Sequence, residues 1–227
     1  MSLYFWVITL SFIGPFLLSF DKKIAFYKNW RFLLPSILLV ALFFICWDER
    51  FTKIGVWGFT PKYLQGIYAG HLPLEEILFF IVIPYNCLFV HEVLKGYFPL
   101  ISLKTFSFVF IYVFGISALI LSLFNLDNYY TLSATALAFG LTLFLVQQKK
   151  IWFSQFVLTY IVCLIPFLVV NGILTGQFTE EPIVWYSENH IVGFRLGTIP
   201  LEDLFYNYCL ILPIIWIYEG FKEHYTK

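Results

Sequence analysis

Two acidic doublets, each at the start of an apolar segment, are the residues of this sequence best suited to acid–base chemistry. Each follows a Pro-Leu pair, within residues 73–76 and 200–203. Carboxyl groups gathered near a low-dielectric cavity do not all ionise, because burial and like-charged neighbours both disfavour the charged form. A protonated carboxyl can protonate an unactivated double bond, while an ionised neighbour stabilises the cation and accepts a proton. The candidate catalytic residues are Glu75, Glu76, Glu202 and Asp203.

A helix cap is the alternative interpretation of each doublet. Pro73 and Pro200 suit the first position of a helix. The acids then fall in the first turn, where free amides and the helix dipole favour negative charge. One carboxylate is enough for a cap, and an Asp at the centre of a membrane helix costs about 2.5 to 3.5 kcal/mol. We therefore favour catalysis, with one acid of each doublet facing the bundle and the other about 100° around the helix. This chemistry needs no cofactor and no metal ion.

Six further polar residues near the doublets are candidates for binding a substrate or for tuning the acids. His71 and Arg195 precede the doublets and can equally be solvated loop residues. Glu188 lies in the polar segment that leads to the second doublet. At helical spacing below Glu75 and Glu202, the sequence carries an apolar and aromatic stripe, which suits an apolar substrate. The six candidates are His71, Asn86, Glu188, Arg195, Tyr206 and Asn207.

The composition indicates that these residues are held by membrane helices. Apolar residues make up 60% of the 227 residues and charged residues only 12%, against about 25% charged in soluble domains. Fourteen basic residues balance fourteen acidic ones, which argues against a nucleic-acid partner. Seven apolar segments are long enough to cross about 30 Å of hydrocarbon. We therefore predict an all-α integral-membrane protein with seven transmembrane helices, at residues 3–20, 30–47, 74–94, 101–124, 130–147, 152–174 and 201–219.

The distribution of basic residues predicts the orientation of these helices. Ten Lys and Arg residues fall on one side of the membrane and four on the other. Positive residues favour the cytoplasmic side, so we expect the N-terminus outside and the C-terminus in the cytoplasm. The long segments 48–73 and 175–200 then lie outside, and a bacterial cytoplasmic membrane is the expected location. The ten residues are Lys22, Lys23, Lys28, Arg31, Lys95, Lys104, Lys149, Lys150, Lys222 and Lys227.

An internal repeat brings the two doublets to one face. At an offset of 127 residues, Gly66 and Gly70 align with Gly193 and Gly197, and the two acidic doublets align with each other. Equivalent helices are separated by an even number of spans, so the units have the same orientation, as in parallel repeats. We therefore predict a 3+1+3 arrangement, with a first three-helix repeat over 1–100, a connecting transmembrane helix over 101–127 and a second three-helix repeat over 128–227.

A second pair of repeat-related charges lies near the cytoplasmic ends of the third and seventh spans. Glu92 and Lys95 in the first unit correspond to Glu219 and Lys222 in the second. An i,i+3 ion pair within each helix and snorkelling of the lysines account for these residues.

With both motifs in view, PLEEILFFIVIPYNCLFVHE and GFRLGTIPLEDLFYN, the chain resembles the small integral-membrane lycopene cyclases. Members of this family occur as two separate subunits in some Gram-positive bacteria and fused to phytoene synthase in fungi. The resemblance covers essentially the whole chain, and its most specific feature is the paired Pro-x-Glu-(Glu/Asp) motif. It implies that the four motif acids are catalytic and that lycopene, a polyene carotenoid, is cyclised through γ-carotene to β-carotene. This chain looks like a fused version of the two-subunit enzyme, without the phytoene synthase domain.

Three alternatives stay open at this point. A cyclase of a C50 carotenoid, or one that forms ε- or γ-rings, has the same motif requirements. A membrane prenyltransferase needs acids that hold Mg²⁺ on a diphosphate, normally with Asp-rich spacing and several nearby basic residues. A proton-coupled carrier would use intramembrane acids as a relay. Which acid donates the proton, and whether copies of the chain form a homo-oligomer, also stay open.

Overall fold

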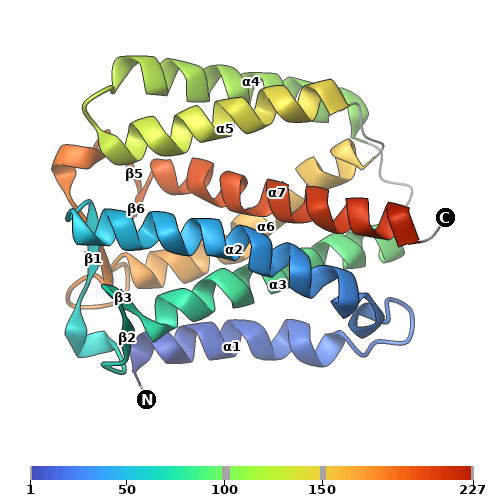
Figure 1. Ribbon diagram of the computed structural model, residues 1–227, viewed down its shortest axis with the longest axis horizontal. Helices are drawn as coiled ribbons and strands as arrows, with labels where there is room; N and C mark the ends of the chain where they lie inside the picture. The colour runs from blue at the N-terminus through green and yellow to red at the C-terminus, as the bar shows by residue number, and fades with distance from the viewer. Residues whose placement is uncertain (1, 99–102, 149–151, 226–227) are drawn as a thin grey trace.

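The computed structural model describes residues 2–98, 103–148 and 152–225, and within them the chain forms a bundle of seven α-helices (Figure 1). Six of them, α2 to α7, are long and apolar enough to cross a membrane, whereas α1 has 16 residues. Lys149, Lys150, Lys227 and the expected boundary at 100–101 lie outside the described residues. The helices are α1 (Leu3–Leu18), α2 (Trp30–Lys53), α3 (Leu74–Tyr97), α4 (Lys104–Phe124), α5 (Tyr129–Gln148), α6 (Phe153–Leu174) and α7 (Glu202–Tyr225).

The outer surface of this bundle is apolar. Leu42, Val113 and Ile165, on three different helices, each have more than half of their surface exposed. A bilayer accommodates such side chains, whereas water does not, because lipid tails are as apolar as leucine. Together with the six long apolar helices, this surface identifies an integral membrane protein.

Helices α3 and α7, which begin at the two acidic doublets, lie at the centre of the bundle. Helix α2 packs on both of them, and so does α6. Helix α1 packs on α3, α5 packs on α7, and α4 covers α5 and α6. The central helices are also the most buried of the six long ones. Side chains at their first turns can therefore face the interior of the protein.

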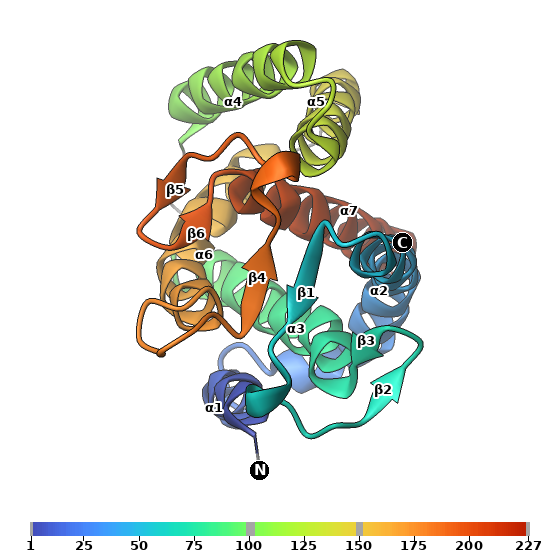
Figure 2. The ribbon, with the colours of Figure 1, turned by 90° about the vertical axis from the view of Figure 1, so that its left-hand side faces the viewer.

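Short strands and 3-10 helices, which the hydropathy pattern does not predict, shape the two long loops. The strands are β1 (Trp57–Phe59), β2 (Tyr68–Ala69), β3 (Leu72–Pro73), β4 (Val184–Tyr186), β5 (Arg195–Leu196) and β6 (Ile199–Pro200). The 3-10 helices are η1 (Phe26–Asn29), which precedes α2, and η2 (Pro61–Tyr63) and η3 (Glu188–His190) in the long loops. Strands β1 and β4 pair antiparallel with Trp57 opposite Tyr186, and Figure 2 shows them side by side across one end of the bundle. The two long loops thus form a single cover over the N-terminal ends of α3 and α7.

Each central helix is entered through a tight hairpin. The hairpins β2–β3 and β5–β6 turn at Gly70 and Gly197, both with φ of +65°, a conformation that glycine adopts without strain. The N–H of Leu74 then donates to the carbonyl of Ile67 at 2.8 Å. The sequence predicts Pro73 and Pro200 at the first helical position, but both lie before their helices. Pro73 is the N-cap of α3, and Pro200 ends β6, before α7 begins at Glu202.

The chain termini lie at opposite ends of the bundle. The N-terminus shares one end with the strands and both long loops, and the C-terminus lies at the other end (Figure 1). The acidic doublets therefore lie at the N-terminal end of the molecule, and Glu92 and Glu219 lie in the C-terminal parts of α3 and α7, toward the far end.

Candidate active site

A cavity of about 60 Å³ lies under the loop cover, and one carboxyl from each motif lines it. These are Glu76 from α3 and Asp203 from α7, the second acid of each doublet. Because α3 and α7 are adjacent at the centre of the bundle, the two repeat-related motifs converge on one cavity. Glu75 and Glu202 are not among the residues that line it.

The first acid of each doublet instead anchors a loop. Glu75 is buried, and its Oε1 accepts a hydrogen bond from the backbone N–H of Gln65 at 2.6 Å. Glu202 is also buried, and its Oε1 accepts from the backbone N–H of Val192 at 2.6 Å. Gln65 and Val192 are 127 residues apart, so the two contacts are equivalent. The members of each doublet therefore differ in position: one holds the loop, and the other faces the cavity.

Asp203 is surrounded by hydrogen-bond donors. Its Oδ1 accepts from the Tyr130 hydroxyl at 2.5 Å, and its Oδ2 accepts from Asn171 Nδ2 at 2.9 Å and from the Tyr186 hydroxyl at 3.1 Å. Burial, and then the negative charges of Asp203 and Glu76, raise the pKa of Tyr186 in the loop well above its usual value. Its hydroxyl therefore keeps its proton and donates. Three donors stabilise the ionised form of the Asp203 carboxyl.

Glu76 has a different environment. Its Oε2 accepts one hydrogen bond, from the Tyr4 hydroxyl at 2.5 Å. No hydrogen bond to its Oε1 is formed by the described residues, and the side chain is only partly buried. Hydrogen bonds therefore stabilise the carboxylate form of Glu76 less than that of Asp203. The two cavity acids are thus unequal.

A third carboxyl, Asp48 of α2, also lines the cavity. The indole Nε1 of Trp57 in β1 donates to its Oδ1. The expected span ended at residue 47, which placed Asp48 in the long segment 48–73, but α2 continues to Lys53. A signal for this was present, because Asp48 continues the helical spacing of the buried residues Ala41 and Phe44.

Aromatic side chains form most of the remaining wall. Tyr130 and Tyr186 stack, with ring centroids 5.7 Å apart and planes at 9°. Ring faces attract cations and pack well on flat conjugated chains. Of the rings that line the cavity, only Tyr206 was a candidate on the sequence alone. The aromatic lining residues are Tyr4, Trp57, Phe59, Phe79, Tyr130, Phe167, Tyr186 and Tyr206.

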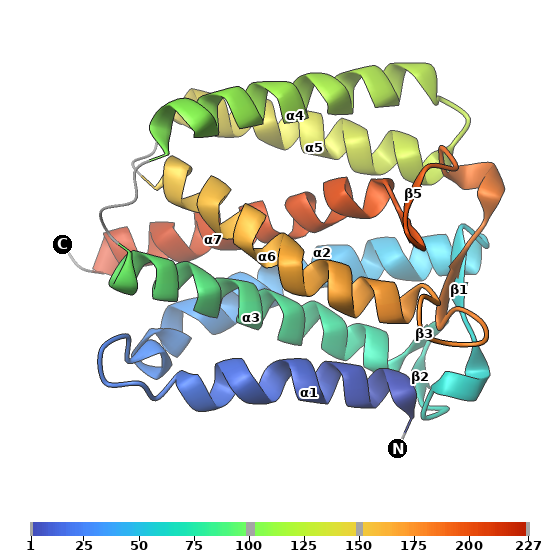
Figure 3. The ribbon, with the colours of Figure 1, turned by 180° about the vertical axis from the view of Figure 1, so that it is seen from behind.

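An apolar groove of about 500 Å³ adjoins this cavity, lined mainly by α1, α3 and α6; Figure 3 shows these helices, with α3 between the other two. Leu18 of α1 and Val169 of α6 line the groove and are 58% and 56% exposed. Because these residues face the surroundings of the bundle, the groove opens sideways toward lipid. Four residues line both the groove and the acid cavity: Phe79, Phe167, Asn171 and Asn207.

The six flanking candidates divide into two groups. Tyr206 lines the acid cavity, Asn86 lines the groove, and Asn207 lines both. His71, Glu188 and Arg195 line neither space.

Each of these three residues has its charged partner in or beside the loops. His71 Nδ1 lies 2.6 Å from Glu49 Oε1, at the end of α2. Arg195 pairs with Glu188 at 2.6 Å. The hairpins therefore direct these side chains away from the cavity.

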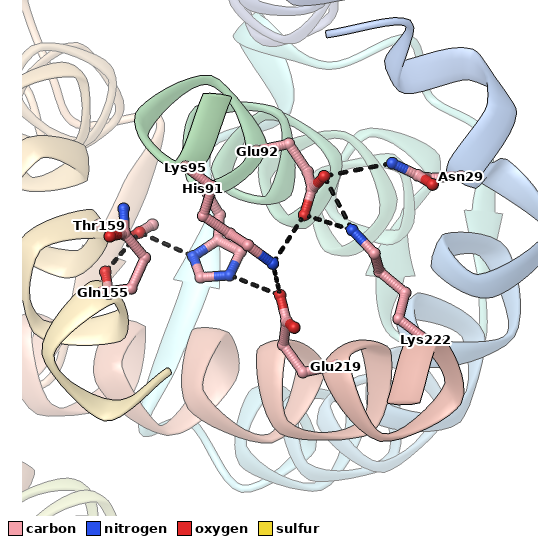
Figure 4. Close-up of polar contacts among 8 residues, drawn as sticks. All are labelled: Asn29, His91, Glu92, Lys95, Gln155, Thr159, Glu219 and Lys222. Atoms are coloured by element: carbon pink, nitrogen blue, oxygen red, sulfur yellow. Dashed lines mark hydrogen bonds and ion pairs between the residues drawn. The ribbon is translucent and has the colours of Figure 1, made fainter. Parts of the chain in front are cut away.

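A second polar cluster joins α3 to α7 at the opposite end of the bundle (Figure 4). Lys95 lies 3.3 Å from Glu92, as expected within one helix, but also 2.5 Å from Glu219 of α7. Lys222 in turn reaches back to Glu92 at 2.9 Å. The nitrogens of buried His91 lie 3.0 Å from Glu219 Oε1 and 2.9 Å from a hydroxyl of α6.

The same cluster has the side-chain types of a metal site. Ligand atoms of His91, Glu92 and Glu219 lie within 4.8 Å of one another. Both carboxylates are, however, already paired with the ammonium groups of Lys95 and Lys222. The arrangement therefore fits a pair of reciprocal ion pairs that link the two central helices.

A membrane bundle with carboxyl groups in an aromatic cavity, joined to a groove that opens toward lipid, defines a membrane protein equipped for acid–base chemistry on an apolar molecule. A family model described as lycopene cyclase matches residues 1–94 and 127–221. The chain belongs to the lycopene cyclase family, and the two matched segments show the family domain in tandem. No curated protein and no solved structure matches the chain.

Membership of this family confirms the resemblance noted in the sequence. It assigns the chain to enzymes of carotenoid cyclisation, with a carotenoid substrate and a lipid environment. The four motif acids all fall within the matched segments.

Proposed function

We propose that this protein is a lycopene β-cyclase, which converts lycopene through γ-carotene to β-carotene in carotenoid biosynthesis. The observation that carries the proposal is the convergence of Glu76 and Asp203, one from each motif, on a single aromatic cavity. The reaction is an isomerisation: a proton enters, a ring closes and a proton leaves. Acid and base groups are sufficient for it.

In the proposed mechanism, Glu76 is the acid and Asp203 is the base. Glu76 gives its proton to C2 of the terminal double bond, which leaves a cation at C1. The C5–C6 double bond attacks C1, a C1–C6 bond forms, and the charge moves to C5. Asp203 then takes the proton from C6, and the C5–C6 double bond of a β-ring results. The assignment follows from hydrogen bonding, because Asp203 accepts from three donors and Glu76 from one.

The walls of the cavity have a role in this mechanism. Tyr130, Tyr186 and Trp57 surround the acids with ring faces, which lower the energy of the intermediate cations. The loop cover excludes water that would otherwise capture these cations.

The groove supplies a route for the substrate. A polyene enters sideways from the lipid between α1 and α6 and lies along the apolar wall. Its end group reaches the acids past Phe79 and Phe167, which line both spaces. The acid cavity is small, so we infer that these rings rotate to admit the end group. With one acid cavity, each end of the polyene must enter in turn, and γ-carotene has to turn round between the two cyclisations.

The domain organisation and the orientation also form part of this proposal. We infer two units over 1–100 and 128–227 joined by a connecting helix, with the N-terminus and the acids on the outer face of a bacterial cytoplasmic membrane. Supporting this, β1 and β4 begin 127 residues apart, as do β2 and β5.

Pigment analysis tests the function directly. Expression of the chain in a lycopene-accumulating bacterium is expected to yield β-carotene, detected by HPLC. When purified protein converts preformed lycopene in D₂O, each ring should gain one deuterium, because the incoming proton derives from solvent through Glu76. Unchanged lycopene in the presence of well-expressed protein would refute the proposal. If the product carries ε- or γ-rings, the protein is still a cyclase, but the proton leaves from a carbon other than C6.

Filling the groove is expected to impair cyclisation. Gly14 of α1 lines the groove, and a Cβ added there meets nothing within 4 Å. Gly14→Trp therefore places a large ring in the substrate path without displacing the helix, and we expect β-carotene formation to fall by at least about tenfold.

Gly140 of α5 is a matched control for this variant. It also has open space around it and does not line the groove. Gly140→Trp should leave the rate of lycopene conversion within about threefold of wild type. Equal losses in the two variants would argue against this entry route.

A further inference from the structure

We infer that Asp48 is a third functional acid of this cavity, which forms with Glu76 an acid pair that retains the proton needed to start the reaction. The inference rests on the proposed function and goes beyond the motif acids. It begins from the position of Asp48, which lines the same cavity although it comes from α2 and lies outside both motifs.

The burial of Asp48 requires it to hold a proton. The residue is 2% exposed, and only its Oδ1 has a donor, the indole of Trp57. Its Oδ2 is buried and has no hydrogen-bond partner among the described residues. A buried carboxylate oxygen without a donor or a counter-charge is costly, by several kcal/mol. The neutral acid, with Oδ2 carrying the proton, avoids this cost.

The charges around Asp48 favour the same state. The described residues that line the cavity include three carboxyls and no Lys, Arg or His. Glu76 of α3 is close enough to Asp48 for their charges to interact. Two acids that interact in a low-dielectric space do not both ionise. A pair made of Asp48 and Glu76 therefore keeps at least one proton.

Other titratable groups near this pair do not change that result. Tyr4 of α1, Tyr186 of β4 and Tyr206 of α7 face it as neutral hydroxyls. Glu49, the neighbour of Asp48 in sequence, is engaged by His71 outside the cavity. Asp203 adds a further negative charge to the cavity, and it is the acid with three donors.

Comparison of the two repeat units shows that only the first unit supplies this acid pair. The residue 127 positions after Asp48 is Thr175, which lines the same cavity but carries no charge. The first unit therefore supplies two acids and the second unit one. This asymmetry places the proton donor on the side of α2 and α3 and the acceptor on the side of α7. After Asp203 has taken a proton and Glu76 has lost one, the Asp48 proton can restore Glu76, and Asp48 regains a proton from Asp203 or from solvent.

The test separates the acidity of Asp48 from its contact with Trp57. Asp48→Asn retains an Oδ1 acceptor for the indole but cannot supply a proton, whereas Trp57→Phe removes the donor and leaves the acid. Purified variants and wild type are assayed with lycopene in liposomes from acidic to alkaline pH. We expect the rate of lycopene conversion by Asp48→Asn to fall by at least about tenfold at neutral pH. Much of this activity should return as the pH is lowered. Asp48→Glu should retain most of the activity. Trp57→Phe also changes the cavity wall, so its rate falls, but it should keep the pH profile of wild type because Asp48 still carries its proton.

Each outcome decides the matter. Asp48→Asn with the rate and pH profile of wild type would overturn the inference, and so would equal, pH-independent losses in Asp48→Asn and Trp57→Phe, which indicate a structural contact. If Asp48→Asn does not fold, Asp48→Thr, which carries the equivalent residue of the second unit, takes its place with the same expectation. Failure of wild type to convert lycopene would instead refute the proposed function.

Discussion

Replacing Glu76 with glutamine is expected to reduce lycopene conversion by about 10²- to 10⁴-fold, the usual contribution of a general acid. The amide keeps an oxygen that can accept from Tyr4 but has no proton acidic enough for an alkene. Lycopene should therefore accumulate unchanged, with neither γ- nor β-carotene, when pigments are separated by HPLC. When preformed lycopene is incubated with this variant in D₂O, the recovered lycopene should likewise contain no deuterium.

The neighbouring residue provides the control for this prediction. Glu75→Gln removes the same charge from the same helical turn, but Glu75 faces the loop and keeps an oxygen for the N–H of Gln65. We expect its activity to stay within about tenfold of wild type, because the two hydrogen bonds that Oε1 accepts, from the N–H of Gln65 and from the Ser2 hydroxyl, are weakened and not lost. A larger loss in Glu75→Gln than in Glu76→Gln would reverse the assignment. Accumulation of γ-carotene in Glu76→Gln would show that the two ends of lycopene react at separate sites.

The distinction between Glu75 and Glu76 illustrates what a single sequence can establish. The motif, its duplication and the membrane helices that follow it are readable as residue types and spacings. Which acid faces the cavity depends on the rotation of α3, and a shift of one residue at its start turns a side chain by about 100°. That rotation is fixed by the hairpin that ends at Pro73 and by the contact with Gln65, and the sequence pattern reveals neither.

The partners of the acids were beyond sequence reasoning for a related reason. Tyr130 is 73 residues from Asp203, and the pairing of β1 with β4 joins Trp57 to Tyr186 across 129 positions. Such contacts depend on how helices and loops meet in space, and strands of three residues carry too little periodicity to be recognised. Asp48 is the intermediate case. Its helical spacing is visible in the sequence, but the span was expected to end at residue 47, just before it, whereas α2 continues to Lys53.

Replacing Asp203 with asparagine is expected to have the second large effect, on both the rate and the products. Without a carboxylate to accept the C6 proton, formation of β-rings should fall by about 10²- to 10⁴-fold. The cation at C5 persists longer and loses a proton from C4 or from the C5 methyl group instead. The small amount of cyclised product should therefore be enriched in ε- or γ-rings, which HPLC with absorbance spectra distinguishes from β-rings.

The change in ring type separates a base from a residue that only shapes the cavity. Asparagine leaves the donors Tyr130, Tyr186 and Asn171 with a poorer acceptor, so some loss of stability is expected in Asp203→Asn, measurable by thermal unfolding. A structural defect slows the reaction but does not move the position of proton loss. Glu202→Gln, which perturbs the neighbouring loop contact to Val192, should accordingly yield only β-rings at a moderately reduced rate. If Asp203→Asn also yields only β-rings, another group removes the C6 proton, and the three donors around Asp203 serve to hold the cavity closed.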